Sequence, residues 1–325
     1  MTEEVVFDTP LSLNLYEDFD DDEDLWYKGI LVSLVTGDVT PTQAAIDIDT
    51  YITQLANQRY EAYQEYQELH PGQTPTDEEE RDRVSGPNPR GDVEMLIQWA
   101  ARLCSAFPPS HAGQERIISF LEALRDLPRH KVLNVVFPRE EGDGMYTAME
   151  LWPLRGRWLS LQQEFRYIED EVIYRTYRAK QPPPSEPDLR WRNFQSAIAR
   201  ITALDLINCD FMCSLGLIIP SHSWYPDLED GNAEGFNWVA GQVIAAVQWL
   251  LRPEVGRYVY QQCRNADTVA SDDRRVIWSL EKWGQWKEQL ARVGEEQRFG
   301  VHARELAKLA CQRMALYERG DAVEL

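Results

Sequence analysis

Residues 40–69 contain the stretch that decides the fold class, and they read TPTQAAIDIDTYITQLANQRYEAYQEYQEL. Thr40 is a suitable N-cap, Pro41 suits the first helical position, and Gln43 stands three residues after the cap. Apolar residues then recur with helical spacing, at Ala44, Ala45, Ile48, Tyr51, Ile52 and Leu55. The pattern predicts one long helix over residues 41–69, which ends before the turn-forming residues Pro71 and Gly72.

Helical patterns of the same kind occupy most of the remaining sequence. We expect further helices at 25–35, 92–107, 110–127, 155–178, 187–205, 207–218, 232–251, 254–264, 272–293 and 300–318. Residues 132–137 are rich in β-branched side chains and could form a strand, but an isolated strand would have no sheet to join. We therefore expect irregular structure there.

The sequence thus predicts an all-α fold. We expect a single helical domain of about ten helices over residues 25–325, preceded by an acidic N-terminal arm over residues 1–24. The proline-rich residues 181–187 are a candidate internal break of that domain.

Acidic residues dominate the charge balance. The chain has 33 Lys and Arg against 54 Asp and Glu, which gives a formal net charge of −21. Ten of the acidic residues, and no Lys or Arg, lie within residues 1–27. Such a charge disfavours nucleic acids and anionic membrane surfaces, because both are themselves negatively charged.

Two further features indicate where the protein works. No stretch of about 18 apolar residues is present, and the N-terminus lacks the basic and apolar regions of a secretory signal. The five cysteines are scattered, which fits a reducing compartment better than a disulfide framework. We therefore expect a cytoplasmic protein.

Five segments together resemble a fungal family of unknown function, DUF3632. They are Leu31 to Ala45, Leu151-Trp152-Pro153-Leu154, Trp191-Arg192-Asn193-Phe194 with Ala199-Arg200, Ala245 to Trp249, and Leu280 to Lys287. One spacing differs in the second segment, the Phe is shifted in the third, and Lys282 replaces an Arg in the last. The resemblance implies a helical cytosolic protein of fungi, often encoded near genes of secondary metabolism. It implies no catalytic residues.

An aspartate-rich motif, Asp20 to Asp24, contains the Asp-Asp-x-x-Asp pattern with which terpene synthases hold Mg²⁺ and a diphosphate. Asn265, Thr268 and Asp272 match the second metal motif of those enzymes. However, the first motif precedes every helix that could build a cavity, so we favour a solvated acidic arm. A Mg-dependent, terpene synthase-like enzyme remains an alternative.

The cysteines offer little chemistry of their own. Cys209, Cys213 and His222 lack a fourth ligand for zinc, and buried helical thiols explain the two cysteines more simply. We expect no metal site and no cofactor.

Eleven tryptophans make the chain unusually rich in large aromatic side chains. Packing of a helical core is the simplest explanation, and an aromatic pocket for an apolar ligand is the alternative. The candidate ligand-binding residues are Trp152, Trp191, Trp224, Tyr225, Trp283 and Trp286. The candidate catalytic residues are Arg200, Asn193 and His222, since Arg200 follows Asn193 by seven residues and both can face one cavity.

We expect a cofactor-free enzyme that binds a hydrophobic polyketide or terpenoid intermediate of fungal secondary metabolism. Orientation and hydrogen bonds would direct a pericyclase-like cyclisation or an isomerisation. The alternative is a non-catalytic helical interaction or scaffold protein, whose acidic arm contacts a basic protein partner. A large apolar cavity lined by Trp would favour the enzyme, whereas a fully packed interior beside an exposed apolar patch would favour the interaction protein.

Overall fold

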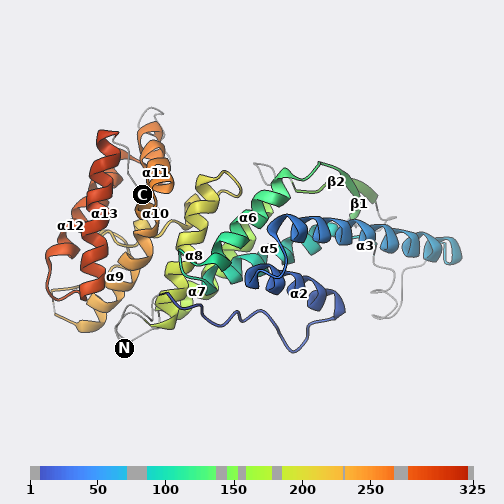
Figure 1. Cartoon of the computed structure of the whole chain (residues 1–325), viewed down its shortest axis with the longest axis horizontal. Coiled ribbons are helices and arrows are strands. Elements are labelled where there is room, and N and C mark those ends of the chain that lie inside the picture. Colours follow the sequence, from blue (N-terminus) through green and yellow to red (C-terminus); the bar gives the residue numbers. More distant parts are fainter. Residues whose placement is uncertain are drawn as a thin grey trace. The chain divides into compact units, whose positions relative to one another are not determined.

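A computed structural model describes residues 8–71, 86–136, 145–152, 159–177, 185–229, 231–266 and 277–320. This part of the chain forms eleven α-helices, two short 3-10 turns and one two-stranded sheet (Figure 1). The predicted all-α class is therefore confirmed. Two compact units can be distinguished: unit 1 comprises Met1–Asn14, Ala101–Gln114 and Phe165–Leu325, and unit 2 comprises Leu15–Ala100 and Glu115–Glu164.

Unit 2 begins with two helices whose ends are set by local caps. In α3 (Pro41–Leu69) the Thr40 side chain accepts a hydrogen bond from the backbone N–H of Gln43, as its sequence predicts. In α2 (Asp22–Thr36) the Asp21 side chain caps the first turn, so the helix begins three residues before the predicted position. Gly37 ends α2 at φ 95°, a backbone conformation that glycine adopts without steric cost.

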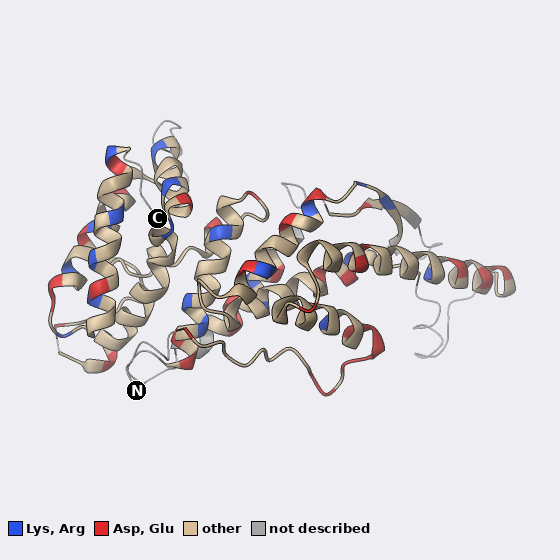
Figure 2. Ribbon diagram, in the orientation of Figure 1, with Lys and Arg blue, Asp and Glu red and all other residues tan. Residues whose placement is uncertain are grey.

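The acidic N-terminal residues include a buried ion pair. The Lys28 ammonium on α2 contacts the Asp20 carboxylate, and the two side chains are 1% and 3% exposed. Lys28 also lies over the Trp99 ring, 4.9 Å from its centroid. In the ribbon of Figure 2, further acidic positions are coloured red before α2 and within its first turn. Asp20 is thus part of the packing of unit 2 and is not a solvated residue.

A β-hairpin corrects the sequence prediction for residues 132–137. Strand β1 (Lys131–Val136) pairs antiparallel with β2 (Met145–Glu150), from Lys131 opposite Glu150 to Val136 opposite Met145. The expected irregular structure is wrong because residues 145–150 supply the missing partner strand. Strand β1 also contacts α3.

Three helices contribute residues to both units: α5 (Pro89–Ala106), α6 (Ala112–Asp126) and α7 (Leu159–Tyr177). The remaining helices belong to unit 1. They are α8 (Glu186–Ala203), α9 (Ala233–Ala246), α10 (Gln248–Leu251), α11 (Pro253–Ala266), α12 (Leu280–Glu295) and α13 (Val301–Arg319). Helices α12 and α13 run side by side in Figure 1.

Two predicted boundaries change in unit 1. The expected helix 207–218 is wrong, because this segment forms only the 3-10 turns Asp210–Met212 and Ser214–Gly216. The expected helix 232–251 is divided at Val247 into α9 and α10. Of the candidate break at 181–187, residues 181–184 lie outside the described residues, whereas Ser185 already caps α8.

The buried ion pair between Lys28 and Asp20 should contribute measurably to folding stability. Replacing one partner of a buried pair leaves the other charge unpaired, so Lys28→Met should destabilise unit 2 by about 3–5 kcal/mol. Adding Asp20→Asn to that variant should recover most of the loss. Arg90→Met, which breaks the exposed pair with Glu94, is the control and should cost about 1 kcal/mol or less. Chemical denaturation measures all four proteins, and equal losses for Lys28→Met and Arg90→Met would contradict the prediction.

Candidate functional site

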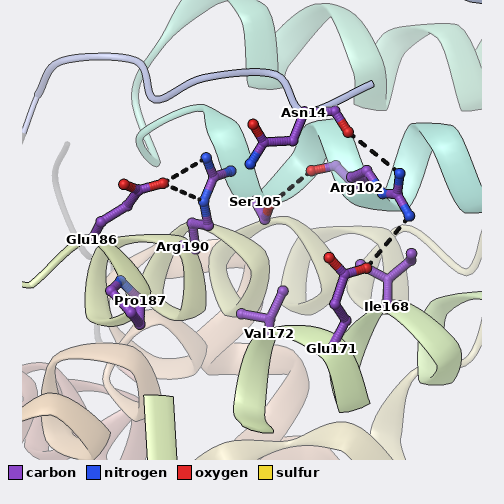
Figure 3. Close-up of a pocket in the computed structure, with 9 residues that line it drawn as sticks. All are labelled: Asn14, Arg102, Ser105, Ile168, Glu171, Val172, Glu186, Pro187 and Arg190. Carbon is purple, nitrogen blue, oxygen red and sulfur yellow. Dashed lines mark hydrogen bonds and ion pairs between the residues drawn. The ribbon is translucent and has the colours of Figure 1, made fainter. Parts of the chain in front are cut away.

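A pocket of about 190 Å³ lies within unit 1 (Figure 3). Its wall comes from the N-terminal segment, α5, α7 and the start of α8, and the lining residues are Asn14, Arg102, Ser105, Ile168, Glu171, Val172, Glu186, Pro187 and Arg190. One water molecule needs about 10–15 Å³, whereas most small-molecule sites measure about 300–1,000 Å³. The pocket is therefore sized for a compact ligand.

Residues 11–14, which we call the N-terminal strap, form one side of the pocket. The backbone N–H of Leu11 donates to the carbonyl of Ala106 at 2.8 Å. Arg190 Nη2 donates to the carbonyl of Ser12 at 2.9 Å, and Arg102 Nη1 donates to the carbonyl of Asn14 at 3.3 Å. Two arginines thus fasten the strap through its backbone.

Each of these arginines also pairs with a glutamate in the pocket wall. Arg190 Nε and Nη2 contact Glu186 Oε1 at 2.9 and 2.8 Å, and Arg102 Nη2 contacts Glu171 Oε2 at 3.4 Å. The Arg190 side chain is only 6% exposed, whereas that of Glu186 is 60% exposed. Figure 3 shows one ion pair on each side of the pocket. The polar wall therefore contains two positive and two negative groups.

Three of the lining residues are apolar. Ile168 and Val172 on α7 are buried, and Pro187 follows Glu186 in the first turn of α8. Ile168 and Val172 are four residues apart, so both side chains lie on one face of α7. A ligand that fits this pocket combines a polar group with a short hydrocarbon part.

Asn193, one of the predicted catalytic residues, is fully buried beside the pocket-lining Ser105. Its Nδ2 donates to the Ser105 carbonyl at 3.1 Å, and its Oδ1 accepts from Arg192 Nη2 at 2.8 Å. Gln114 donates to the Asn193 carbonyl at 3.0 Å and accepts from the Ser196 hydroxyl at 3.1 Å. These contacts commit the Asn193 amide to packing α8 against residues 101–114.

The other two predicted catalytic residues do not line this pocket. Arg200 is half-buried near the end of α8. Burial raises the pKa of the Cys104 thiol to about 12, and the nearby positive charge of Arg200 opposes this rise. His222 accepts a hydrogen bond from the Trp224 N–H at 3.2 Å, and burial lowers its pKa. None of the three predicted catalytic residues therefore lines the pocket, although Asn193 binds the carbonyl of the lining residue Ser105.

The predicted aromatic ligand-binding residues are distributed over both units, and three of the six donate an indole hydrogen bond to a neighbouring side chain. The Trp191 indole N–H donates a hydrogen bond to Gln242, and the Trp283 indole N–H donates one to Glu318. In unit 2, Trp152 donates to Asp49 at 2.6 Å. These contacts support the explanation that the tryptophans pack the core.

The last three aromatic candidates also lie outside the pocket wall. Trp286 is fully buried on α12, and the Tyr225 hydroxyl accepts a hydrogen bond from Gln289 at 2.8 Å. Trp224 is 50% exposed. None of the six predicted aromatic residues is among those that line the described pocket.

The aspartate-rich motif is used for folding. Asp20 pairs with Lys28 and Asp21 caps α2, so neither carboxylate is available as a terpene synthase motif would require. Within the described ranges, no group of three or more His, Cys, Asp or Glu residues could hold a metal ion. Asn265 is exposed on α11, while Thr268 and Asp272 lie outside the described residues. The contacts of Asp20 and Asp21 therefore argue against the magnesium-dependent alternative.

The pocket residues were missed because little in the sequence marks them. Glu186 and Arg190 are four residues apart and resemble an ordinary surface pair on a helix. Arg102 and Glu171 are separated by 69 residues, and no local pattern connects them. The one local signal is the i, i+4 spacing of Glu186 and Arg190, which does not distinguish a pocket wall from a solvated helix face.

The fold and the pocket define a helical protein with a compact pocket whose wall is partly charged and partly apolar. The family model for DUF3632, described as a protein of unknown function, matches residues 94–290. The chain therefore belongs to the DUF3632 family. No curated protein and no solved structure matches this chain. Among the described helices, none combines the length and apolar composition that a membrane span requires.

A buried carboxyl group on α7 should make the folding stability depend on pH. Burial raises the pKa of Glu169 from its ordinary 4.5 to about 7, although Arg166 opposes the shift. Between these values the folded protein retains a proton that the unfolded chain has lost. Folding stability attributable to Glu169 therefore falls as the pH rises from about 4.5 to about 7.

The variant Glu169→Gln removes this proton linkage. Between pH 5 and pH 8 it should lose less stability than the wild type, by on the order of 2 kcal/mol. Denaturation at the two pH values measures the difference. Glu234→Gln, on the exposed first turn of α9, serves as the matched control. Equal pH dependence of Glu169→Gln and the wild type would show that the Glu169 carboxyl is not linked to folding.

Proposed function

We propose that this DUF3632 protein binds a small molecule in the pocket formed by the N-terminal strap, α5, α7 and α8. One observation supports the proposal above all: a pocket of about 190 Å³ combines fixed arginines with the buried side chains of Ile168 and Val172. A site with an apolar part and a few oriented polar groups is the usual form of a small-molecule site.

The arginines support binding because they are already held in place. Arg102 and Arg190 each contact a strap carbonyl and a glutamate, so little side-chain freedom remains to be lost when a ligand enters. Arginine also stays charged at any physiological pH and presents its donors in a fixed plane. The pocket therefore recognises a polar group by geometry as well as by charge.

The cyclisation or isomerisation of a polyketide or terpenoid intermediate, expected from the sequence, stays a prediction. A pocket of about 190 Å³ is smaller than the usual range for drug-sized ligands, and its wall contains four charged residues. Such a wall favours a smaller and more polar molecule than the expected hydrophobic intermediate. We retain fungal secondary metabolism as the proposed setting from which candidate ligands are drawn.

The alternative function, contact with a basic protein partner, is favoured by a different part of the chain. Before α2 in unit 2, Phe19 is 80% exposed and Tyr16 is 54% exposed. The exposed acids Glu17, Asp18 and Asp21 adjoin them. Exposed aromatic side chains among carboxylates suit a partner that offers both apolar and basic groups.

A pocket-filling substitution tests the proposed binding function. Val172→Phe places a larger side chain in the cavity, and overpacking should cost about 1–3 kcal/mol without preventing folding. Methyl NMR of the wild type against a panel of small polar metabolites should show saturable shifts at Ile168 and Val172. Binding, followed at Ile168, should weaken at least tenfold in Val172→Phe.

The matched control makes the same change on the surface. Val301→Phe, at a residue 57% exposed on α13, should bind as the wild type does. Unchanged affinity in Val172→Phe, or no methyl shift with any member of the panel, would overturn the proposed function.

A further inference from the structure

We infer that the ligand of this pocket is a small aliphatic carboxylate, with its carboxylate at Arg190 and Asn14 and its alkyl part against α7. The inference rests on the proposed function and names the ligand class of the same site. Four features of the described residues support it: two available N–H donors, the balance of charge in the wall, the apolar side chains opposite, and the size of the space.

The first donor belongs to Arg190. Its Nε and Nη2 are used by Glu186 and by the Ser12 carbonyl, whereas Nη1 has no hydrogen-bond acceptor among the described residues. Figure 3 places Asn14 and Ser105 on the side of the guanidinium that faces away from Glu186. A ligand can therefore bind Nη1 without displacing Glu186.

The second donor belongs to Asn14. Its Oδ1 accepts a hydrogen bond from the Ser12 hydroxyl at 2.9 Å, which orients the amide. Its Nδ2 has no hydrogen-bond acceptor in the part of the chain that the structure describes. Asn14 adopts φ 49°, a left-handed conformation that asparagine tolerates better than most residues. Two N–H donors from different elements thus line one side of the pocket, as a two-oxygen anion requires.

The charges of the wall limit the ligand to one negative charge. Arg102 and Arg190 contribute two positive charges, and Glu171 and Glu186 contribute two negative charges. A monoanion meets the guanidinium of Arg190, whereas a second negative charge would meet the nearby glutamates with only Arg102, already paired with Glu171, to offset them. The wall therefore favours a carboxylate over a phosphate dianion.

The opposite side of the pocket defines the rest of the ligand. Ile168, Val172 and Pro187 present hydrocarbon surface, and the space of about 190 Å³ admits a short branched chain. Removing that chain from water adds affinity that the polar contacts alone would not give. An aliphatic acid of about five carbon atoms meets both requirements.

Isovalerate is the direct probe, because isovaleramide is its neutral isostere and inorganic phosphate carries the charge without the alkyl group. Methyl NMR at Ile168 and Val172 should give saturable shifts with isovalerate, with a dissociation constant in the millimolar range expected of so small a ligand. Isovaleramide and phosphate should each bind at least tenfold more weakly.

Two variants of Asn14 test the position of the carboxylate. Asn14→Gly keeps the left-handed backbone and removes the donor, so isovalerate should bind about fivefold more weakly. Asn14→Asp is nearly isosteric and adds a negative charge, so the loss should exceed thirtyfold. Asn265→Asp makes the same chemical change on the exposed face of α11 and should leave affinity unchanged. The methyl spectra of the free variants verify that each is folded.

The outcomes separate this inference from the proposed function. Isovaleramide that binds as tightly as isovalerate would overturn the carboxylate inference and leave a small-molecule site in place. Equal affinity of Asn14→Asp and Asn265→Asp would overturn it as well. If none of the three probes shifts the methyls while other metabolites do so, the ligand class is wrong. If neither the three probes nor any of the small polar metabolites shifts these methyl signals, the proposed function fails.

Discussion

The amide side chains of α8 are the constraint on which unit 1 depends. Every residue from Asp188 to Ala199 is buried, so the polar groups on this helix must find partners inside the protein. Gln195 accepts hydrogen bonds from the Ser214 backbone and hydroxyl and from the Trp249 indole, and it donates to the Met212 carbonyl. One amide thereby fixes both 3-10 turns and α10 against α8.

The same constraint explains the pocket. Asn193 fixes the Ser105 backbone, and Arg190, three residues earlier on α8, holds the Ser12 carbonyl of the strap. The pocket wall is therefore an extension of the hydrogen bonds that assemble unit 1. Because the donors are held by the fold itself, the site has its geometry before any ligand enters.

The sequence predicted those elements whose bounds are set by interactions within a few residues. The cap at Thr40 and the apolar spacing gave the bounds of α3, because both act within a few residues. The hairpin was missed since β1 depends on pairing with residues 145–150. The helix expected at 207–218 failed because Gln195, which lies outside that segment, binds the backbone at Met212 and Ser214. In both cases the deciding partner is distant in the sequence.

The candidate site was predicted less well for the same reason, and its charge could not be inferred from the composition. A net charge of −21 argues against a polyanionic partner, which experiences the whole surface. Surface charges more than about 8 Å away are largely screened by physiological salt, whereas charges inside a pocket are screened much less. The adjacent guanidinium of Arg190 and amide of Asn14 then determine what binds. A strongly acidic protein can thus present a binding site for a single carboxylate, because that site depends on a few fixed donors and not on the total charge.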